Sequence, residues 1–153
     1  MEDLKKTAEV LNDLIKINND RIAGYQKAIA ELPAAHVDLK ALFSGLIEQS
    51  QNLKTELQEH ISSRENVVDE DTTMAGRIYR AWMDVKVIMA MDDRKALLES
   101  CEYGEDAAQR AYRQAEQEEG ISIAAKSLIS KQKTQLLASH DHVKQLRDRE
   151  KVI

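Results

Sequence analysis

The residues best suited to chemistry in this chain are glutamates and a histidine that interrupt otherwise apolar helical stripes. Glu105 lies on the stripe that includes Cys101, and Glu102 lies three residues earlier on nearly the same face. A helical hairpin folded about Gly120 brings His140 within about one turn of Glu105. Carboxylate and imidazole groups that converge in this way are ligands for iron or manganese. One hypothesis is therefore a metal site.

A ferritin-type di-metal centre takes a glutamate from each of two helices and a Glu-x-x-His pair from each of the other two. The sequence contains no Glu-x-x-His, and its nearest approximation, Glu56 with His60, is spaced by four residues. The metal hypothesis, with iron or manganese as the cofactor, draws on five ligands: Glu56, His60, Glu102, Glu105 and His140.

The competing hypothesis is a hydrogen-bonded polar layer that sets the register between helices and binds no cofactor. Asn18 interrupts the stripe of the first helical segment, and Gln49 and Ser50 interrupt that of the second. A turn at Pro33 places these residues at the same height. Buried amides fix register in this way in coiled coils. The expected layer has six members: Asn18, Asn19, Gln49, Glu102, Glu105 and His140. A small-molecule pocket at the same height is a third interpretation, and we expect no catalytic residue.

Within this layer, we expect Glu105 to be buried and hydrogen-bonded across helices. The partners in reach are Asn18, Gln49, a glutamine at position 132 or 135, and His140. Neutral amide partners predict that Glu105→Gln is tolerated. Glu105→Ala should destabilise by about 1–3 kcal/mol, because it leaves buried polar groups without a partner.

The elements that must position these residues are long helices. In the first segment, apolar residues alternate three and four apart and form one stripe: Leu4, Ala8, Leu11, Ile15, Ile22, Tyr25 and Ile29. Similar patterns predict long helices over about 3–32, 36–64, 93–118 and 122–149, and a crossover helix over about 73–91. The fold class is all-α, a ferritin-like four-helix bundle with a long crossover between helices 2 and 3. An extended coiled coil is the alternative.

The composition agrees with one soluble helical domain over 1–153. The chain has five glycines and one proline, too few for a protein of many short strands, and no apolar run longer than Val87–Met91. One cysteine and no visible secretory signal favour the cytoplasm. The net charge of −5 is a poor match for nucleic acid. We therefore expect neither a nucleic-acid nor a membrane partner.

The charges of the last two helical segments are complementary. Residues 92–120 carry nine acidic and four basic side chains, a balance of −5, whereas residues 126–153 carry seven basic and three acidic, a balance of +4. Opposite charges on adjacent antiparallel helices attract weakly. The basic C-terminal segment is thus expected to complement its neighbour rather than bind nucleic acid.

Five parts of the chain, which together span nearly its whole length, carry a resemblance to a known family: Leu11–Asp20 with Gly24 and Tyr25, Leu39–Phe43, Ala81–Lys86, Glu99–Asp106 and His140–Asp148. They resemble segments of a bacterial family of uncharacterised ferritin-like four-helix-bundle proteins, a domain of unknown function. The resemblance implies a ferritin-like bundle in a bacterial cytoplasm and no established activity.

The expected function is that of a non-enzymatic, stress-associated helical bundle that acts through self-association or partner binding. The alternative is a divergent di-metal carboxylate oxidoreductase or metal-binding protein. We expect a monomer or homodimer, because nothing in the sequence resembles the extra short helix that ferritins use at the axes of their cages.

Overall fold

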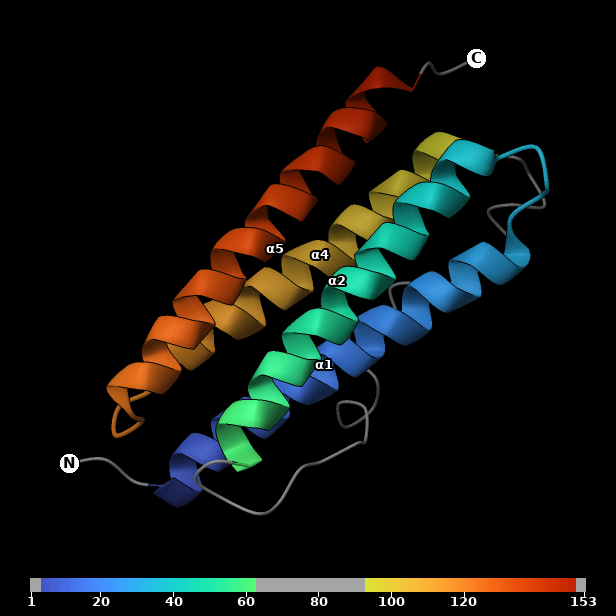
Figure 1. Ribbon diagram of the computed structural model, residues 1–153. Coiled ribbons are helices and arrows are strands. Elements are labelled where there is room, and N and C mark those ends of the chain that lie inside the picture. The colour runs from blue at the N-terminus through green and yellow to red at the C-terminus, as the bar shows by residue number, and fades with distance from the viewer. Residues whose placement is uncertain (1–3, 63–92, 151–153) are drawn as a thin grey trace.

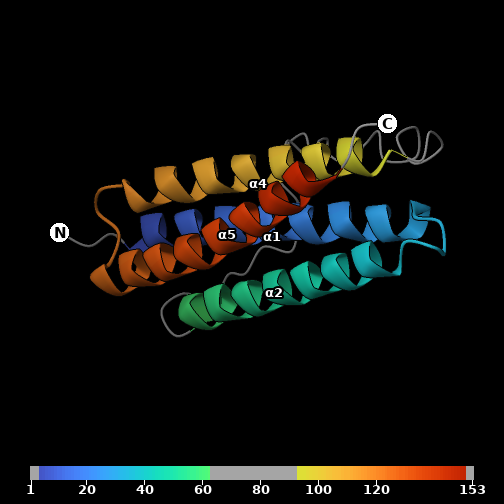
Figure 2. The same cartoon turned by 90° about the horizontal axis from the view of Figure 1, so that it is seen from above.

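A computed structural model describes residues 4–62 and 93–150 of the chain. This described part forms four α-helices and no strand. In chain order they are α1 (Leu4–Glu31), α2 (Val37–Ser62), α4 (Arg94–Glu116) and α5 (Ile123–Arg149). Figures 1 and 2 show the four helices lying lengthwise beside one another as a bundle.

The bundle consists of two antiparallel hairpins, because α1 packs most closely on α2 and α4 on α5. Pro33 follows α1 and accepts a hydrogen bond from the His36 amide, which closes the turn into α2. Gly120, with φ of 83°, allows the turn between α4 and α5, because a side chain is strained at that angle. The side chains of Asp93 and Ser122 cap the first turns of α4 and α5.

The two hairpins bury one hydrophobic core to which all four helices contribute. Leu11, Phe43, Leu98 and Leu136, one from each helix, are fully buried members of this cluster. A helix with an apolar stripe is stabilised chiefly by burying it against its neighbours, so the core holds the four helices together.

The observed helix bounds lie within two residues of the ranges expected from the sequence. The expected crossover helix over about 73–91 lies outside the described residues. Within the described part, α2 ends at one end of the bundle and α4 begins at the other, so α2 and α4 run in the same direction (Figure 1). None of the described helices is apolar enough over a sufficient length to cross a bilayer.

Opposite charges do meet where α4 and α5 pack. Lys133 Nζ lies 2.7 Å from Glu116 Oε1, and Arg147 pairs with Glu102. The hydrogen bond from Lys133 is the main cause that lowers the pKa of Glu116. The charge complementarity of the last two segments is therefore expressed as contacts between these two helices.

The N-cap at Ser122 provides a test of how much the turn between α4 and α5 contributes to the stability of the protein. Ser122 Oγ accepts from the Ala125 amide, and the Ser122 amide donates to Thr7 Oγ1 of α1. We expect Ser122→Ala to lower the free energy of unfolding by about 0.5–2 kcal/mol, measured by urea denaturation. Ser127→Ala, at an exposed site of the same helix, is the matched control and should change stability little. Equal stability of the two variants would contradict this.

Candidate functional site

The bundle interior holds a buried ion pair between Arg21 of α1 and Glu105 of α4. Arg21 Nε and Nη2 lie 2.9 Å and 2.8 Å from Glu105 Oε1, and both residues are only 1% exposed. Tyr25 donates its hydroxyl to the same carboxylate oxygen at 2.5 Å. Glu105 is thus buried and hydrogen-bonded across helices, as expected, but its partners are Arg21 and Tyr25 rather than the expected amides and His140.

The guanidinium of Arg21 also reaches the second helix. Its Nη1 donates to Ser50 Oγ at 2.8 Å and to the Leu46 carbonyl at 3.4 Å. The Tyr25 ring lies 5.6 Å from the guanidinium carbon and stacks on Phe43. One arginine therefore links α1, α2 and α4, and its Nε and Nη1 donate to fixed acceptors.

A second polar chain, which is a series of hydrogen bonds that links all four helices, begins about one turn along α1 from Arg21. Asn18 Nδ2 donates to the Tyr112 hydroxyl at 2.9 Å, and that hydroxyl donates to Gln132 Oε1 at 2.7 Å. Gln132 Nε2 then donates to the Leu53 carbonyl at 3.0 Å and to Glu56 at 3.3 Å. This chain fixes the heights of α1, α4, α5 and α2 relative to one another.

The electrostatics of the interior keep these groups in one protonation state. Burial, followed by the negative charge of Glu105, raises the pKa of Tyr25 well above its ordinary value. Burial likewise raises the pKa of Tyr112. Burial opposes the charge of Arg21, but the Glu105 carboxylate raises the pKa of the guanidinium overall. At neutral pH both tyrosines donate and Arg21 is charged.

Of the expected members of the polar layer, Asn18 and Glu105 make hydrogen bonds within this interior network, whereas Gln49 makes its hydrogen bonds to α5 outside it. Asn19 is partly buried on α1. Gln49 is partly buried between α2 and α5, where its Nε2 donates to the Gln135 carbonyl and its Oε1 accepts from Ser139. Of the two residues that interrupt the second stripe, the one in the interior is thus Ser50, which is fully buried.

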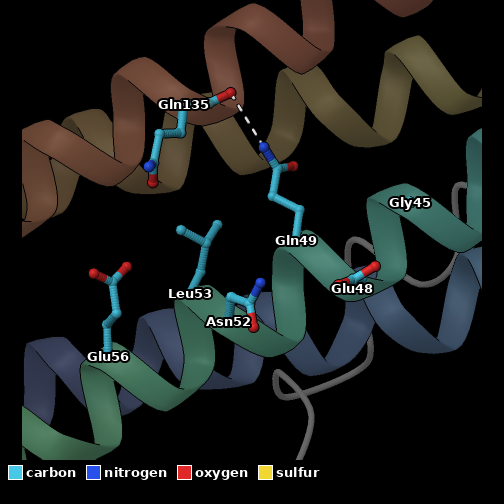
Figure 3. Close-up of a pocket in the computed structure, with 7 residues that line it drawn as sticks. All are labelled: Gly45, Glu48, Gln49, Asn52, Leu53, Glu56 and Gln135. Carbon is cyan, nitrogen blue, oxygen red and sulfur yellow. Dashed lines mark hydrogen bonds between the residues drawn. The ribbon is translucent and has the colours of Figure 1, made fainter.

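A shallow groove of about 320 Å³ lies beside Gln49, between α2 and α5 (Figure 3). Five of its seven lining residues have polar side chains, and the lining consists of Gly45, Glu48, Gln49, Asn52, Leu53, Glu56 and Gln135. Glu56 is paired with Lys131 of α5 at 3.0 Å. The groove brings together no set of groups suited to catalysis.

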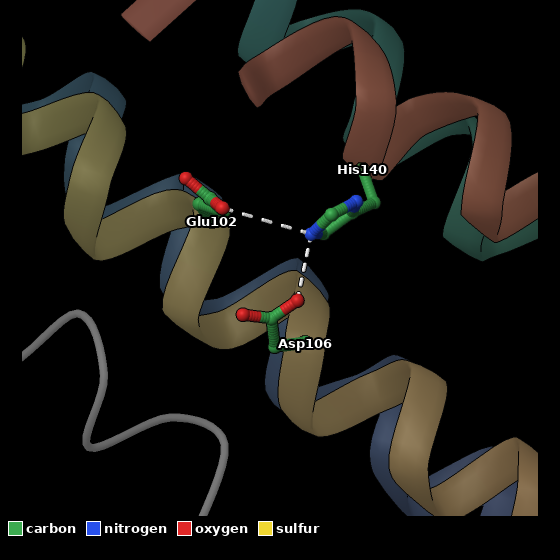
Figure 4. A group of neighbouring side chains, drawn as sticks. All are labelled: Glu102, Asp106 and His140. Carbon is green, nitrogen blue, oxygen red and sulfur yellow. Dashed lines mark ion pairs between the residues drawn. The ribbon is translucent and has the colours of Figure 1, made fainter.

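Glu102 and His140 meet at a different place, on the seam between α4 and α5 (Figure 4). His140 Nε2 lies 2.6 Å from Asp106 Oδ1 and 3.9 Å from Glu102 Oε1. One ligand atom from each of these three side chains lies within 4.8 Å of the others. No other such set of three occurs among residues 4–62 and 93–150. This Glu102–Asp106–His140 cluster is the candidate ligand site.

The cluster contains two of the five ligands named from the sequence and adds Asp106. Glu105 is absent from it because it faces α1, whereas Glu102 and Asp106, four residues apart, share the face toward α5. Glu56 lies on α2 beside Gln132, and His60 lies one turn further along α2. The five residues therefore do not converge on one point.

The comparisons with known proteins agree with a family of undetermined activity. Residues 6–118 match a family model described as a domain of unknown function (DUF2383). The chain belongs to this family. The matched range contains the Arg21–Glu105 pair, while α5 lies beyond it. No curated protein matches the chain.

The ion pair changes what is expected of Glu105 variants. Because the partner is a charged arginine rather than an amide, Glu105→Gln leaves a buried cation without a counter-charge. We expect this substitution to lower the free energy of unfolding by about 3–5 kcal/mol in urea denaturation. The double variant Arg21→Met/Glu105→Gln leaves no buried charge and should recover most of the loss. A double variant no more stable than Glu105→Gln alone would show that the ion pair is not the cause.

Proposed function

We propose that this protein is a non-enzymatic helical bundle, ferritin-like in topology, that acts through self-association or partner binding. The observation that carries this proposal is the Arg21–Glu105 pair. In ferritin-type di-metal proteins, inward-facing carboxylates are neutralised by metal ions. Here a guanidinium neutralises the carboxylate, and both groups are almost fully buried.

The direction of the helices supports the ferritin-like part of the proposal. Helices α2 and α4 run in the same direction, and α2 ends at the opposite end of the bundle from the start of α4 (Figure 1). A four-helix bundle with one long crossover connection has this order of directions, whereas an up-down-up-down bundle does not. A cytoplasmic location and an association with stress stay predictions from the sequence.

The second candidate function, metal binding, is favoured by the Glu102–Asp106–His140 cluster. A di-metal oxidoreductase is supported less well than metal binding alone. Glu105 is engaged by Arg21 and Tyr25, and Glu56 by Lys131 and Gln132, so these carboxylates already have cationic or hydrogen-bonding partners.

The described surface carries a small number of large apolar side chains that suit association. Tyr103 is 61% exposed on α4, and Leu137 and Ile123 are exposed on α5. Aromatic residues are enriched in protein interfaces. Tyr103 is therefore the residue we propose to test first for self-association.

For the purified, tag-free protein, light scattering should give the mass of one or two 17.4 kDa chains. If the dimer forms, Tyr103→Ser should weaken it, because it removes exposed apolar area. Tyr103→Phe retains that area and is the matched control. A mass of several hundred kilodaltons would contradict the proposal.

The non-enzymatic part is tested by turnover. Addition of the protein to aerobic ferrous iron, or to ferrous iron with hydrogen peroxide, should oxidise the iron no faster than an inert protein at the same concentration. Sustained multiple-turnover oxidation by the wild-type chain would overturn the proposal and favour the oxidoreductase alternative.

A further inference from the structure

We propose that Glu102, Asp106 and His140 bind one divalent first-row transition-metal ion, of which Zn²⁺ is the representative. The ion would lie on the seam between α4 and α5, outside the interior ion pair (Figure 4). The inference rests on the second candidate function, metal binding, and names its ligands and ion. It needs neither turnover nor self-association, so its failure leaves the non-enzymatic proposal standing.

The first support is the placement of the three ligand atoms. Glu102 and Asp106 are one turn apart on α4, and His140 faces them from α5. Bonds of about 2.1 Å from a metal ion separate its ligand atoms by about 3–3.5 Å at right or tetrahedral angles. The observed spacings from His140 Nε2, 2.6 Å and 3.9 Å, lie on either side of that range. Each of the two spacings therefore differs from that range by less than about 0.5 Å.

The second support is the orientation of the His140 ring. Its Nδ1 lies 3.1 Å from Asp141 Oδ1, and because a carboxylate only accepts, a hydrogen bond between the two atoms places the hydrogen on Nδ1. In the neutral ring this leaves the lone pair on Nε2, the atom that faces Glu102 and Asp106. A carboxylate that fixes the tautomer of a histidine through its second nitrogen is the usual outer partner in metal sites.

The third support is the way that Asp106 approaches the ring. Its Oδ1 is only 2.6 Å from Nε2, yet Nε2 is buried and has no hydrogen-bond partner within the described part of the chain. The oxygen therefore lies off the direction in which Nε2 would donate a hydrogen. Two ligand atoms that bind one ion at about 90–110° likewise face the ion rather than each other.

The charge around the cluster also favours a cation. Glu102, Asp106 and Asp141 carry three negative charges, and Arg147 contributes one positive charge by pairing with Glu102 Oε2. Arg147 is shared with the carboxylate of Asp148. The cluster therefore keeps a negative excess, while Glu102 Oε1 still faces His140.

The ligand types select the class of metal. One imidazole nitrogen and two carboxylate oxygens suit Zn²⁺, Fe²⁺ or Mn²⁺, whereas Mg²⁺ and Ca²⁺ prefer all-oxygen sites. His140 is 14% exposed and Asp106 46% exposed, so water can complete the coordination shell. The alternative account is an ion pair between a protonated His140 and these carboxylates, with no metal.

A titration with Zn²⁺, monitored by calorimetry on tag-free protein that has been treated with chelator, distinguishes the metal site from the ion pair without metal. We expect one Zn²⁺ per chain, and Co²⁺ should give visible absorption bands with the same stoichiometry. His140→Ala and Asp106→Asn should each weaken Zn²⁺ binding at least tenfold. His142→Ala removes an exposed histidine two residues away, on another face of α5, and should leave the affinity unchanged.

Circular dichroism establishes that each variant is helical. If His140→Ala does not fold, the nearly isosteric Asp106→Asn gives the same test. Asp141→Asn retains all three ligands and should weaken binding by about tenfold through the lost orientation of the ring. Absence of saturable binding, an unchanged affinity in a folded His140→Ala or Asp106→Asn, or an equal loss in His142→Ala would overturn the proposal.

Discussion

The structure depends on the requirement that a charge buried in a helical bundle has a partner. Arg21 and Glu105 come from different hairpins, and each would be costly in the interior without the other. Their contact aligns α1 with α4, and the bonds from Arg21 to Ser50 and the Leu46 carbonyl align α2 as well. The pair thus restricts the two hairpins to one relative height, which a purely apolar interface does not specify as sharply.

The second polar chain extends this restriction to the fourth helix. Gln132 accepts from Tyr112 of its own hairpin and donates to the Leu53 carbonyl of the other. Each hairpin packs most closely within itself, so contacts between the hairpins are the ones that most need a specifying interaction. Polar groups that cross between hairpins provide it, because a shift of one turn would leave buried donors and acceptors unpaired.

The sequence predicts the four long helices well, because proline, glycine and the apolar spacing mark their limits. It predicts the interior less well. In α1 the buried side chains follow a spacing of four and three through Leu14, Asn18, Arg21, Tyr25 and Ala28, while Ile22 is only partly buried. The stripe expected from the sequence includes Ile22 instead of Arg21, because an arginine is rarely buried unless it is paired. Arg21 could have been identified from the sequence, because it continues the spacing of Asn18 and because an acidic residue, Glu105, lies on the apolar stripe of another helix.

The polar residues of α4 are divided between two sites by helical geometry alone. At about 100° per residue, Glu102 and Asp106 point about 40° apart and Glu105 points about 100° from Asp106. Glu105 therefore reaches α1, while the other two reach His140 on α5. An ion bound by the Glu102–Asp106–His140 cluster would cross-link α4 to α5 within one hairpin, and the Arg21–Glu105 pair would continue to hold the hairpins together. The two sites can be altered separately, since they share a helix but not a ligand.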